Sequence, residues 1–120
     1  MLLIVDDDPV FLRNAEENLN EGRGILFARD AAHARTLLET VGGGIGVVLV
    51  DLDLPGQDGF SLIREVSREY PTMPVIAISG VVQLDVLESA KAMGARATLR
   101  KPVSPEWRKT IASVRGGAAS

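Results

Sequence analysis

The residues best suited to chemistry in this sequence are acidic side chains that stand directly after short apolar runs. Asp6, Asp7 and Asp8 follow the first such run, and Asp51 follows the third. If these runs are neighbouring parallel strands, the carboxylates meet at one edge of a sheet. Two carboxylates about 4 Å apart repel each other by roughly 4 kcal/mol at an effective dielectric constant of about 20, so the cluster requires a cation or bound protons. Oxygen ligands favour a hard divalent ion, of which Mg²⁺ is the usual one.

A single aspartate at the start of a loop often does no more than cap a helix or make a turn soluble. Asp8 precedes Pro9, a pair typical of a helix N-terminus, and we expect Asp8 to be a cap. The joint placement of the others argues against the same explanation for all of them. Asp6, Asp7 and Asp51 are therefore the candidate metal-binding carboxylates.

Two further polar residues follow the fourth and fifth apolar runs. Ser79 precedes Gly80, and Lys101 precedes Pro102. Taken singly, the serine is typical of a turn and the lysine of a solvated charge. A lysine ammonium can also neutralise anionic oxygens, and a hydroxyl can donate a hydrogen bond to one. Together with Asp51 these residues indicate a phosphoryl site, in which a carboxylate attacks phosphorus while a cation and a lysine hold the oxygens.

The elements that must position these residues are five apolar runs that alternate with five segments of helical spacing. Strands are expected at Leu2–Val5, Ile25–Ala28, Val47–Val50, Pro74–Ile78 and Ala97–Leu99. The third and fourth runs are apolar almost throughout, as in parallel strands that are covered on both faces. A (βα)5 chain of 120 residues is too short for an eight-stranded barrel. We predict an α/β, flavodoxin-like, doubly wound sheet of order 2-1-3-4-5, with its ligand site between the first and third strands.

Capping and helix-ending residues agree with this division of the chain. Side chains expected to precede helices are those of Asp8, Asp30, Asp58 and Ser104. Glycines expected to follow helices are Gly22, Gly24, Gly42 to Gly44 and Gly94. Residues 1–115 are expected to form one domain, and residues 116–120 a flexible tail or the start of a linker.

The composition excludes several classes of function. The formal net charge is −3, from 13 basic and 16 acidic residues spread along the chain, so nucleic-acid binding by this domain is not expected. Cysteine is absent, which excludes thiolate metal sites and cysteine nucleophiles, and the single His33 cannot form a histidine cluster. No apolar run reaches the roughly 18 residues of a membrane span. We therefore expect a cytoplasmic protein with no membrane contact.

Four motifs, LLIVDDDP, VVLVDLDLPGQDG, VIAISG and LRKP, resemble those of the response-regulator receiver family of two-component signalling in order and spacing. The resemblance covers nearly the whole chain. It implies that Asp6 and Asp7 bind Mg²⁺, and that Asp51 is the phosphoacceptor that becomes 4-aspartylphosphate. It also implies that the backbone carbonyl of Asp53 completes the metal site.

The resemblance extends to the residues that contact the phosphoryl group. Ser79 resembles the switch serine or threonine of the family, and Lys101 resembles its invariant lysine. The Lys101-Pro102 bond is expected to be cis, as it usually is in the family. Pro55 and Gly59 match the loop after the acceptor, where glycine permits backbone angles that other residues resist.

The sequence departs from the family at the position three residues before the lysine. Thr98 stands where the family usually has Tyr or Phe, the rotameric partner of the switch hydroxyl, so the usual coupling is not implied. Val103 replaces a common Phe. Trp107 could be an exposed docking residue, but its spacing with Ile111 and Val114 favours core packing.

The family resemblance implies a bacterial signalling module rather than an independent enzyme, with at most weak self-catalysed phosphotransfer and dephosphorylation. The phosphoryl donor would be a sensor histidine kinase or a phosphotransfer protein, and the output would belong to an effector domain or protein. A homodimer through the fourth helix, fifth strand and fifth helix stays open.

The sequence leaves other functions open. A receiver-like interaction module that is not regulated by phosphorylation is consistent with Thr98. Asp51 and Asp53 also resemble the paired aspartates of haloacid-dehalogenase-type phosphatases, although nothing after Lys101 supplies the further acidic motif of that class. A flavodoxin-like electron carrier is disfavoured, because the acidic loop after the first strand would repel a flavin phosphate.

Overall fold

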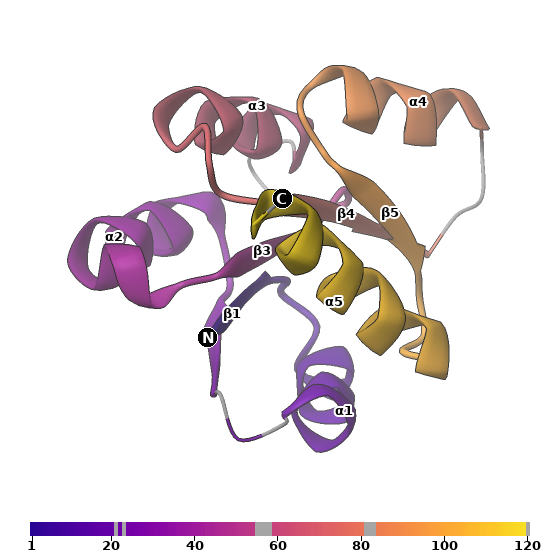
Figure 1. Cartoon of the computed structure of the whole chain (residues 1–120). Helices are drawn as coiled ribbons and strands as arrows, with labels where there is room; N and C mark the ends of the chain where they lie inside the picture. The colour runs from indigo at the N-terminus through magenta and orange to yellow at the C-terminus, as the bar shows by residue number, and fades with distance from the viewer. Residues whose placement is uncertain (21, 23, 55–58, 81–83, 120) are drawn as a thin grey trace.

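Strands and helices alternate along the chain, as the spacing of apolar residues predicted (Figure 1). The computed structural model describes residues 1–20, 22, 24–54, 59–80 and 84–119. The strands are β1 (Leu2–Val5), β2 (Ile25–Ala28), β3 (Val47–Asp51), β4 (Val75–Ser79) and β5 (Ala97–Arg100). The helices are α1 (Pro9–Leu19), α2 (Ala31–Val41), α3 (Gly59–Glu69), α4 (Leu84–Ala92) and α5 (Pro105–Ala119), and a short 3-10 helix, η1, spans Gly42–Gly44.

The sheet confirms the predicted topology. All its pairings are parallel, and the strand order is β2-β1-β3-β4-β5. Val5 of β1 pairs with Val50 of β3, so the residues that follow them, Asp6 and Asp51, lie side by side at the carboxyl edge. The reversal of strand order falls between β1 and β3, which is where sheets of this kind bind ligands.

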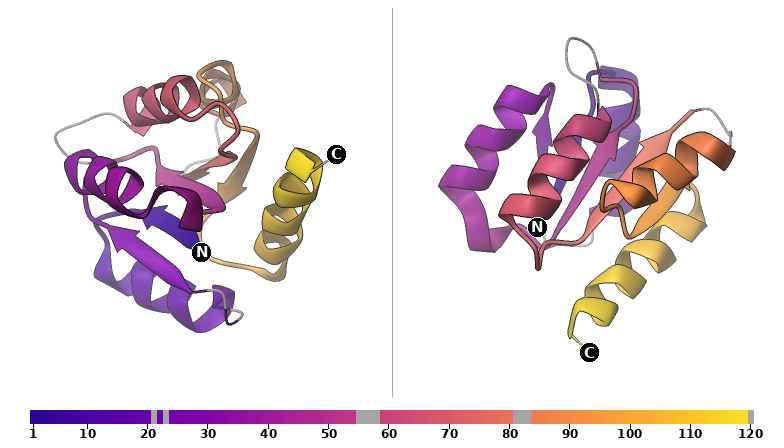
Figure 2. Two further views of the ribbon diagram at one scale, coloured as in Figure 1. Left: turned by 60° about the vertical axis from the view of Figure 1, so that its left-hand side comes forward. Right: turned by 90° about the horizontal axis from the view of Figure 1, so that it is seen from above.

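A helical layer lies on each face of the sheet (Figure 2). Apolar side chains that alternate between the two faces of the strands attach these layers to the sheet. On β1, Leu3 and Val5 pack with residues of α2, α3 and α4, whereas Leu2 and Ile4 pack with residues of α1 and α5. All of β1, β3 and β4 is buried, as expected of central parallel strands. Burial of each large aliphatic side chain contributes about 1.5–3 kcal/mol, so these three strands fix the frame that carries the carboxylates.

Most of the predicted helix boundaries are confirmed. The side chain of Asp8 accepts a hydrogen bond from the Val10 amide at 3.0 Å, and that of Asp30 accepts one from the His33 amide at 2.8 Å. The predicted cap Asp58 lies outside the described residues. Gly94, with φ of +122°, follows α4 as predicted. Helix α5 runs to Ala119. The division of the chain into a domain of residues 1–115 and a tail or linker of residues 116–120 stays a prediction.

The predicted reason for a glycine at position 59, after β3, is wrong. Gly59 does not have a positive φ, so its place is not explained by unusual backbone angles. A Cβ atom at Gly59 would lie 2.3 Å from the carbonyl oxygen of Asp51 and 2.9 Å from the Cα of Leu52. Glycine is needed because α3 begins in contact with the backbone of Asp51. The other predicted loop residue, Pro55, lies outside the described residues.

We expect Gly59→Ala to lower the free energy of unfolding by about 1–3 kcal/mol, the usual cost of forcing an extra methyl group into a packed interior. Urea denaturation would measure the loss. Gly43→Ala is the matched control, because Gly43 has an ordinary φ and no atom within 4 Å of an added Cβ. Equal stability of the two variants would contradict the close approach of α3 to Asp51.

Candidate functional site

The polar residues singled out in the sequence converge at the carboxyl edge of the sheet. Asp6 follows β1, Asp51 ends β3, Ser79 ends β4 and Lys101 follows β5. The backbone amide of Lys101 donates a hydrogen bond to the carbonyl oxygen of Ser79 at 2.9 Å, which joins the ends of β4 and β5. Four neighbouring strands thus deliver these residues to one place, as predicted.

Three carboxylates form a cluster at this edge. Asp6, Asp7 and Asp51 each offer an oxygen within 4.8 Å of the others. Asp6 is fully buried and Asp51 is 3% exposed, while Asp7 is exposed to solvent. The side chain of Asp53 is also exposed, and its backbone amide donates to Oδ1 of Asp51 at 3.1 Å. The prediction for Asp53 concerned its carbonyl group, and it stays a prediction.

The Lys101 ammonium bridges the two buried carboxylates. Its Nζ lies 2.6 Å from Oδ2 of Asp6 and 3.4 Å from Oδ2 of Asp51. Oδ1 of Asp6 accepts a hydrogen bond from the Asp8 amide at 2.9 Å, so both oxygens of Asp6 are held. These contacts exclude the alternative in which Lys101 is only a solvated surface charge.

Burial and charge act on Asp51 and Lys101 in opposite senses. Burial, aided by the charge of Asp6, raises the pKa of Asp51, although the Asp53 amide and Lys101 act against that rise. Burial alone would lower the pKa of Lys101, but the close ion pair with Asp6 and the charge of Asp51 outweigh that effect, and the pKa of Lys101 is raised. Lys101 is therefore a cation at neutral pH, whereas the surroundings of Asp51 disfavour its charged form.

The charge balance of the cluster fits a bound divalent cation. Three carboxylates face one ammonium, which leaves an excess of two negative charges. The donors are hard oxygen atoms, the set that Mg²⁺ and Ca²⁺ prefer. Asp7 is the exposed member of the cluster, so an ion held there would have one ligand in contact with solvent.

Ser79 and Thr98 lie on the neighbouring strands β4 and β5. Ser79 is buried at the end of β4, on the same edge of the sheet as Lys101. Thr98 is half-buried within β5, opposite Ala77 of β4. The predicted core position of Trp107 is confirmed, because only 1% of this residue is exposed.

Sequence reasoning missed one residue that contacts the site. Phe11 of α1 lies beneath Lys101, whose Nζ is 4.5 Å from the centre of the ring. The ring was recognisable only as one apolar residue in a helix of ordinary amphipathic pattern. Its spacing from Asp8 carries no signal for a contact with Lys101, a residue that is distant in sequence.

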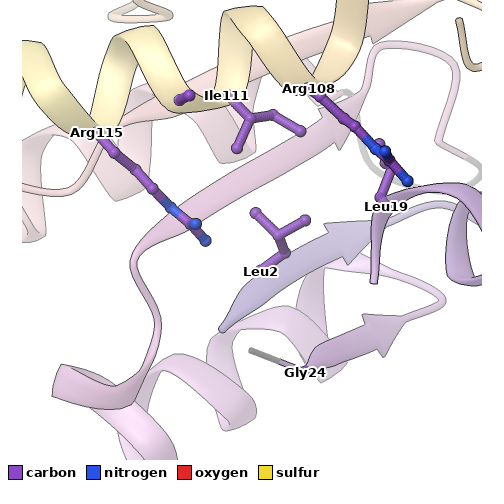
Figure 3. A pocket seen from close by; sticks show the side chains of 7 residues that line it. Leu2, Leu19, Gly24, Arg108, Ile111 and Arg115 are labelled. Carbon is purple, nitrogen blue, oxygen red and sulfur yellow. The ribbon is translucent and has the colours of Figure 1, made fainter. Parts of the chain in front are cut away.

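A cavity of about 240 Å³ lies beneath α5 at the other end of the sheet (Figure 3). Arg108 extends from α5 toward Leu19 at the end of α1, where its guanidinium donates hydrogen bonds to the carbonyl oxygen of Asn18, and Leu2 and Arg115 also line the cavity. Leu2 begins β1, whereas Asp6 follows its end, so the cavity is remote from the carboxylates.

Among the described helices, none is long and apolar enough to cross a membrane.

Comparisons with known proteins agree with this geometry. The family model for the response regulator receiver domain matches residues 2–112. The chain is 34% identical over 111 residues to the two-component response regulator ORR21 of Oryza sativa subsp. indica, covering 92% of this chain and 16% of that protein. It is 30% identical over 105 residues to the transcriptional activator protein ExaE of Pseudomonas putida, covering 87% of this chain and 49% of that protein.

Solved structures show the same fold. A CheY-like response regulator receiver domain protein from Methanospirillum hungatei JF-1 superposes with a TM-score of 0.88 at 27% identity, and the match covers 98% of this chain and 94% of that one. The curated relatives ORR21 and ExaE are at least twice as long as the part that the chain matches.

We expect Asp51→Asn to stabilise the metal-free protein by roughly 0.5–2 kcal/mol at pH values well above the pKa of Asp51. The raised pKa means that ionisation of Asp51 costs stability as the pH rises through it. The gain should vanish as the pH falls through the same pKa, because protonated aspartate and asparagine are both neutral. Urea denaturation across this pH range measures it. Asp53→Asn, at an exposed side chain, is the control and should show no such dependence.

Mg²⁺ should raise the melting temperature by relieving repulsion within the cluster. At ten times the dissociation constant a bound ion contributes about 1.4 kcal/mol, which corresponds to roughly 6 °C for a domain of this size. Thermal unfolding in MgCl₂, compared with NaCl at equal ionic strength, separates binding from screening. Asp7→Asn should reduce the shift and Asp85→Asn, on exposed α4 surface, should not. A shift that is the same in both salts would argue against the cluster as a metal site.

Proposed function

The chain belongs to the response regulator receiver domain family, and we propose on this premise that it accepts a phosphoryl group on Asp51 in a Mg²⁺-dependent reaction. The observation that supports the proposal is the setting of Asp51. It is buried at the switch point, beside two further carboxylates, and its second oxygen faces the Lys101 ammonium.

The chemistry follows from these contacts. A carboxylate oxygen of Asp51 attacks phosphorus of a phosphohistidine, the donor P–N bond breaks, and the electron pair leaves with the imidazole nitrogen. The product is an acyl phosphate on Asp51 and a histidine that takes up a proton. Lys101 would pair with a phosphoryl oxygen, and the Ser79 hydroxyl would donate a hydrogen bond to another.

The residues that would hold Mg²⁺ are Asp6, Asp7 and Asp51, with the carbonyl group of Asp53 as a further ligand. When bound, the ion supplies positive charge to the phosphoryl oxygens during transfer. Attack requires the ionised form of Asp51. Lys101 and the Asp53 amide favour that form, against the effect of burial and of the charge on Asp6.

The role proposed for the domain is a switch. Phosphorylation adds charge and acceptor oxygens at the carboxyl edge of the sheet. The equilibrium between two conformations of the domain then shifts toward the one that interacts more favourably with the phosphoryl group. The donor would be a sensor histidine kinase or phosphotransfer protein, and the reader an effector domain or protein, in the cytoplasm. ExaE bears the name of a transcriptional activator, and half of its length lies outside the match, which is consistent with an attached output domain.

We propose no independent enzymatic activity for the chain beyond slow self-catalysed transfer and hydrolysis. One relative, a protein-glutamate methylesterase/protein-glutamine glutaminase of Myxococcus xanthus, is 31% identical over 110 residues, but the match covers only 30% of it. The part that is shared is thus a minor share of that enzyme. Thr98, in place of an aromatic residue, keeps an unphosphorylated interaction module as the second candidate.

Incubation with acetyl phosphate and MgCl₂ tests the assignment. Intact-mass spectrometry should show one added phosphoryl group in the wild type and none in Asp51→Asn. Lys101→Met should slow labelling about 10²-fold, the usual loss when a group that stabilises developing charge is removed. Asp53→Asn keeps the backbone carbonyl and should still be labelled.

Label that persists in Asp51→Asn would refute Asp51 as the acceptor. An unlabelled wild type whose partner affinity is unchanged by Asp51→Asn would favour the second candidate instead.

A further inference from the structure

We propose that Phe11, supported by Trp107, is a positioning residue that holds the Lys101 ammonium at the acceptor carboxylate. The inference rests on the proposed function of Asp51, because it concerns the placement of the cation that would pair with the phosphoryl group. It assigns a role in the chemistry to an apolar residue of α1.

Phe11 supplies an aromatic contact to the ammonium in addition to the two carboxylates. The Nζ atom lies 4.5 Å from the centre of the ring, within the roughly 6 Å at which a cation is attracted to an aromatic face. Asp6 and Asp51 contact the same nitrogen atom. Phe11 is only 6% exposed, so water is largely displaced from its side of the contact. The ammonium is thus held between two carboxylates and one ring.

Trp107 fixes both partners of this contact. Its ring lies 5.7 Å from that of Phe11, with an angle of 52° between the planes, an arrangement typical of paired aromatic side chains. Its Nε1 donates a hydrogen bond at 3.0 Å to the carbonyl oxygen of Arg100, the residue before Lys101. Trp107 therefore supports the ring beneath the lysine and also the backbone from which the lysine extends.

A lysine needs such support more than a shorter side chain would. Its stem has four carbon atoms and many rotamers, and its ammonium accepts many geometries. Transfer to Asp51 is sensitive to the placement of charge, since a misplacement of about 1 Å can reduce a rate by about 10²-fold. A buried ring in contact with the ammonium limits the rotamers that Lys101 can adopt, and so favours the one in which its Nζ atom contacts both carboxylates.

Labelling kinetics with acetyl phosphate test this role. Phe11→Leu and Phe11→Met keep an apolar side chain but remove the ring, and each should reduce the maximal rate about 3- to 30-fold, the range expected for loss of a cation–π contact. The Mg²⁺ concentration that gives half the maximal rate should stay unchanged, because no carboxylate is altered. Phe11→Tyr keeps the aromatic face and should remain within about threefold of the wild type.

Phe27→Leu is the matched control. Phe27 lies on β2 and packs against the same apolar cluster as Phe11. Its substitution should leave the labelling rate unchanged, although it removes a ring from the same face of the sheet. Trp107 is the single tryptophan, so its emission reports on this region directly. Beryllofluoride with Mg²⁺ should change the emission in the wild type and change it less in Phe11→Leu.

The outcomes separate the two proposals. A wild type that is not labelled overturns the proposed function, and this inference with it. A labelled wild type with equal rates in Phe11→Leu, Phe11→Met and Phe27→Leu overturns the positioning role alone. So does a Phe11 variant in which the half-saturating Mg²⁺ concentration rises with no loss of maximal rate, because that result would place the effect at the metal ligands rather than at Lys101.

Discussion

The ion pairs of Lys101 are the interaction on which the rest of the site depends. Asp6 and Asp51 are both buried, and a pair of unscreened carboxylates could not occupy adjacent strand ends without a compensating charge. Lys101 supplies it from β5, at 2.6 Å from one carboxylate and 3.4 Å from the other. The compensation is incomplete, since Asp7 adds a third negative charge. The incomplete balance keeps the cluster receptive to a cation, which a neutral cluster would not be.

The parallel sheet holds these charged residues on a rigid backbone. Strands β1, β3 and β4 are buried on both faces by aliphatic side chains, so their carboxyl ends are fixed relative to one another. The acceptor backbone is further constrained by Gly59, where α3 begins too close to Asp51 for a side chain. Rigidity of the backbone matters here because charges placed by a rigid frame need no reorganisation when further charge develops.

Much of this could be predicted from the sequence because the signals are local. Apolar runs, caps and the order of strands required only periodicity and chain length, and the four polar residues followed from their place after each run. Strands β3, β4 and β5 each end one residue later than predicted, at Asp51, Ser79 and Arg100. Apolar patterning reports on side chains, whereas a strand continues for as long as its backbone is paired. The close approach at Gly59 and the contact of Phe11 with Lys101 depend on tertiary packing, for which no local pattern exists.

The aromatic residues show how packing on one face of the sheet relates to chemistry at its edge. The family resemblance leads one to look for an aromatic partner of the switch hydroxyl in β5, and Thr98 stands there instead. The rings that do lie near the site come from α1 and α5, where Phe11 contacts Trp107 and Lys101. A displacement of the ammonium on phosphorylation would alter its contact with Phe11 and, through that ring, the packing of α5. The helical layer formed by α1 and α5 is therefore connected to the charge state of Asp51 through Lys101 and Phe11.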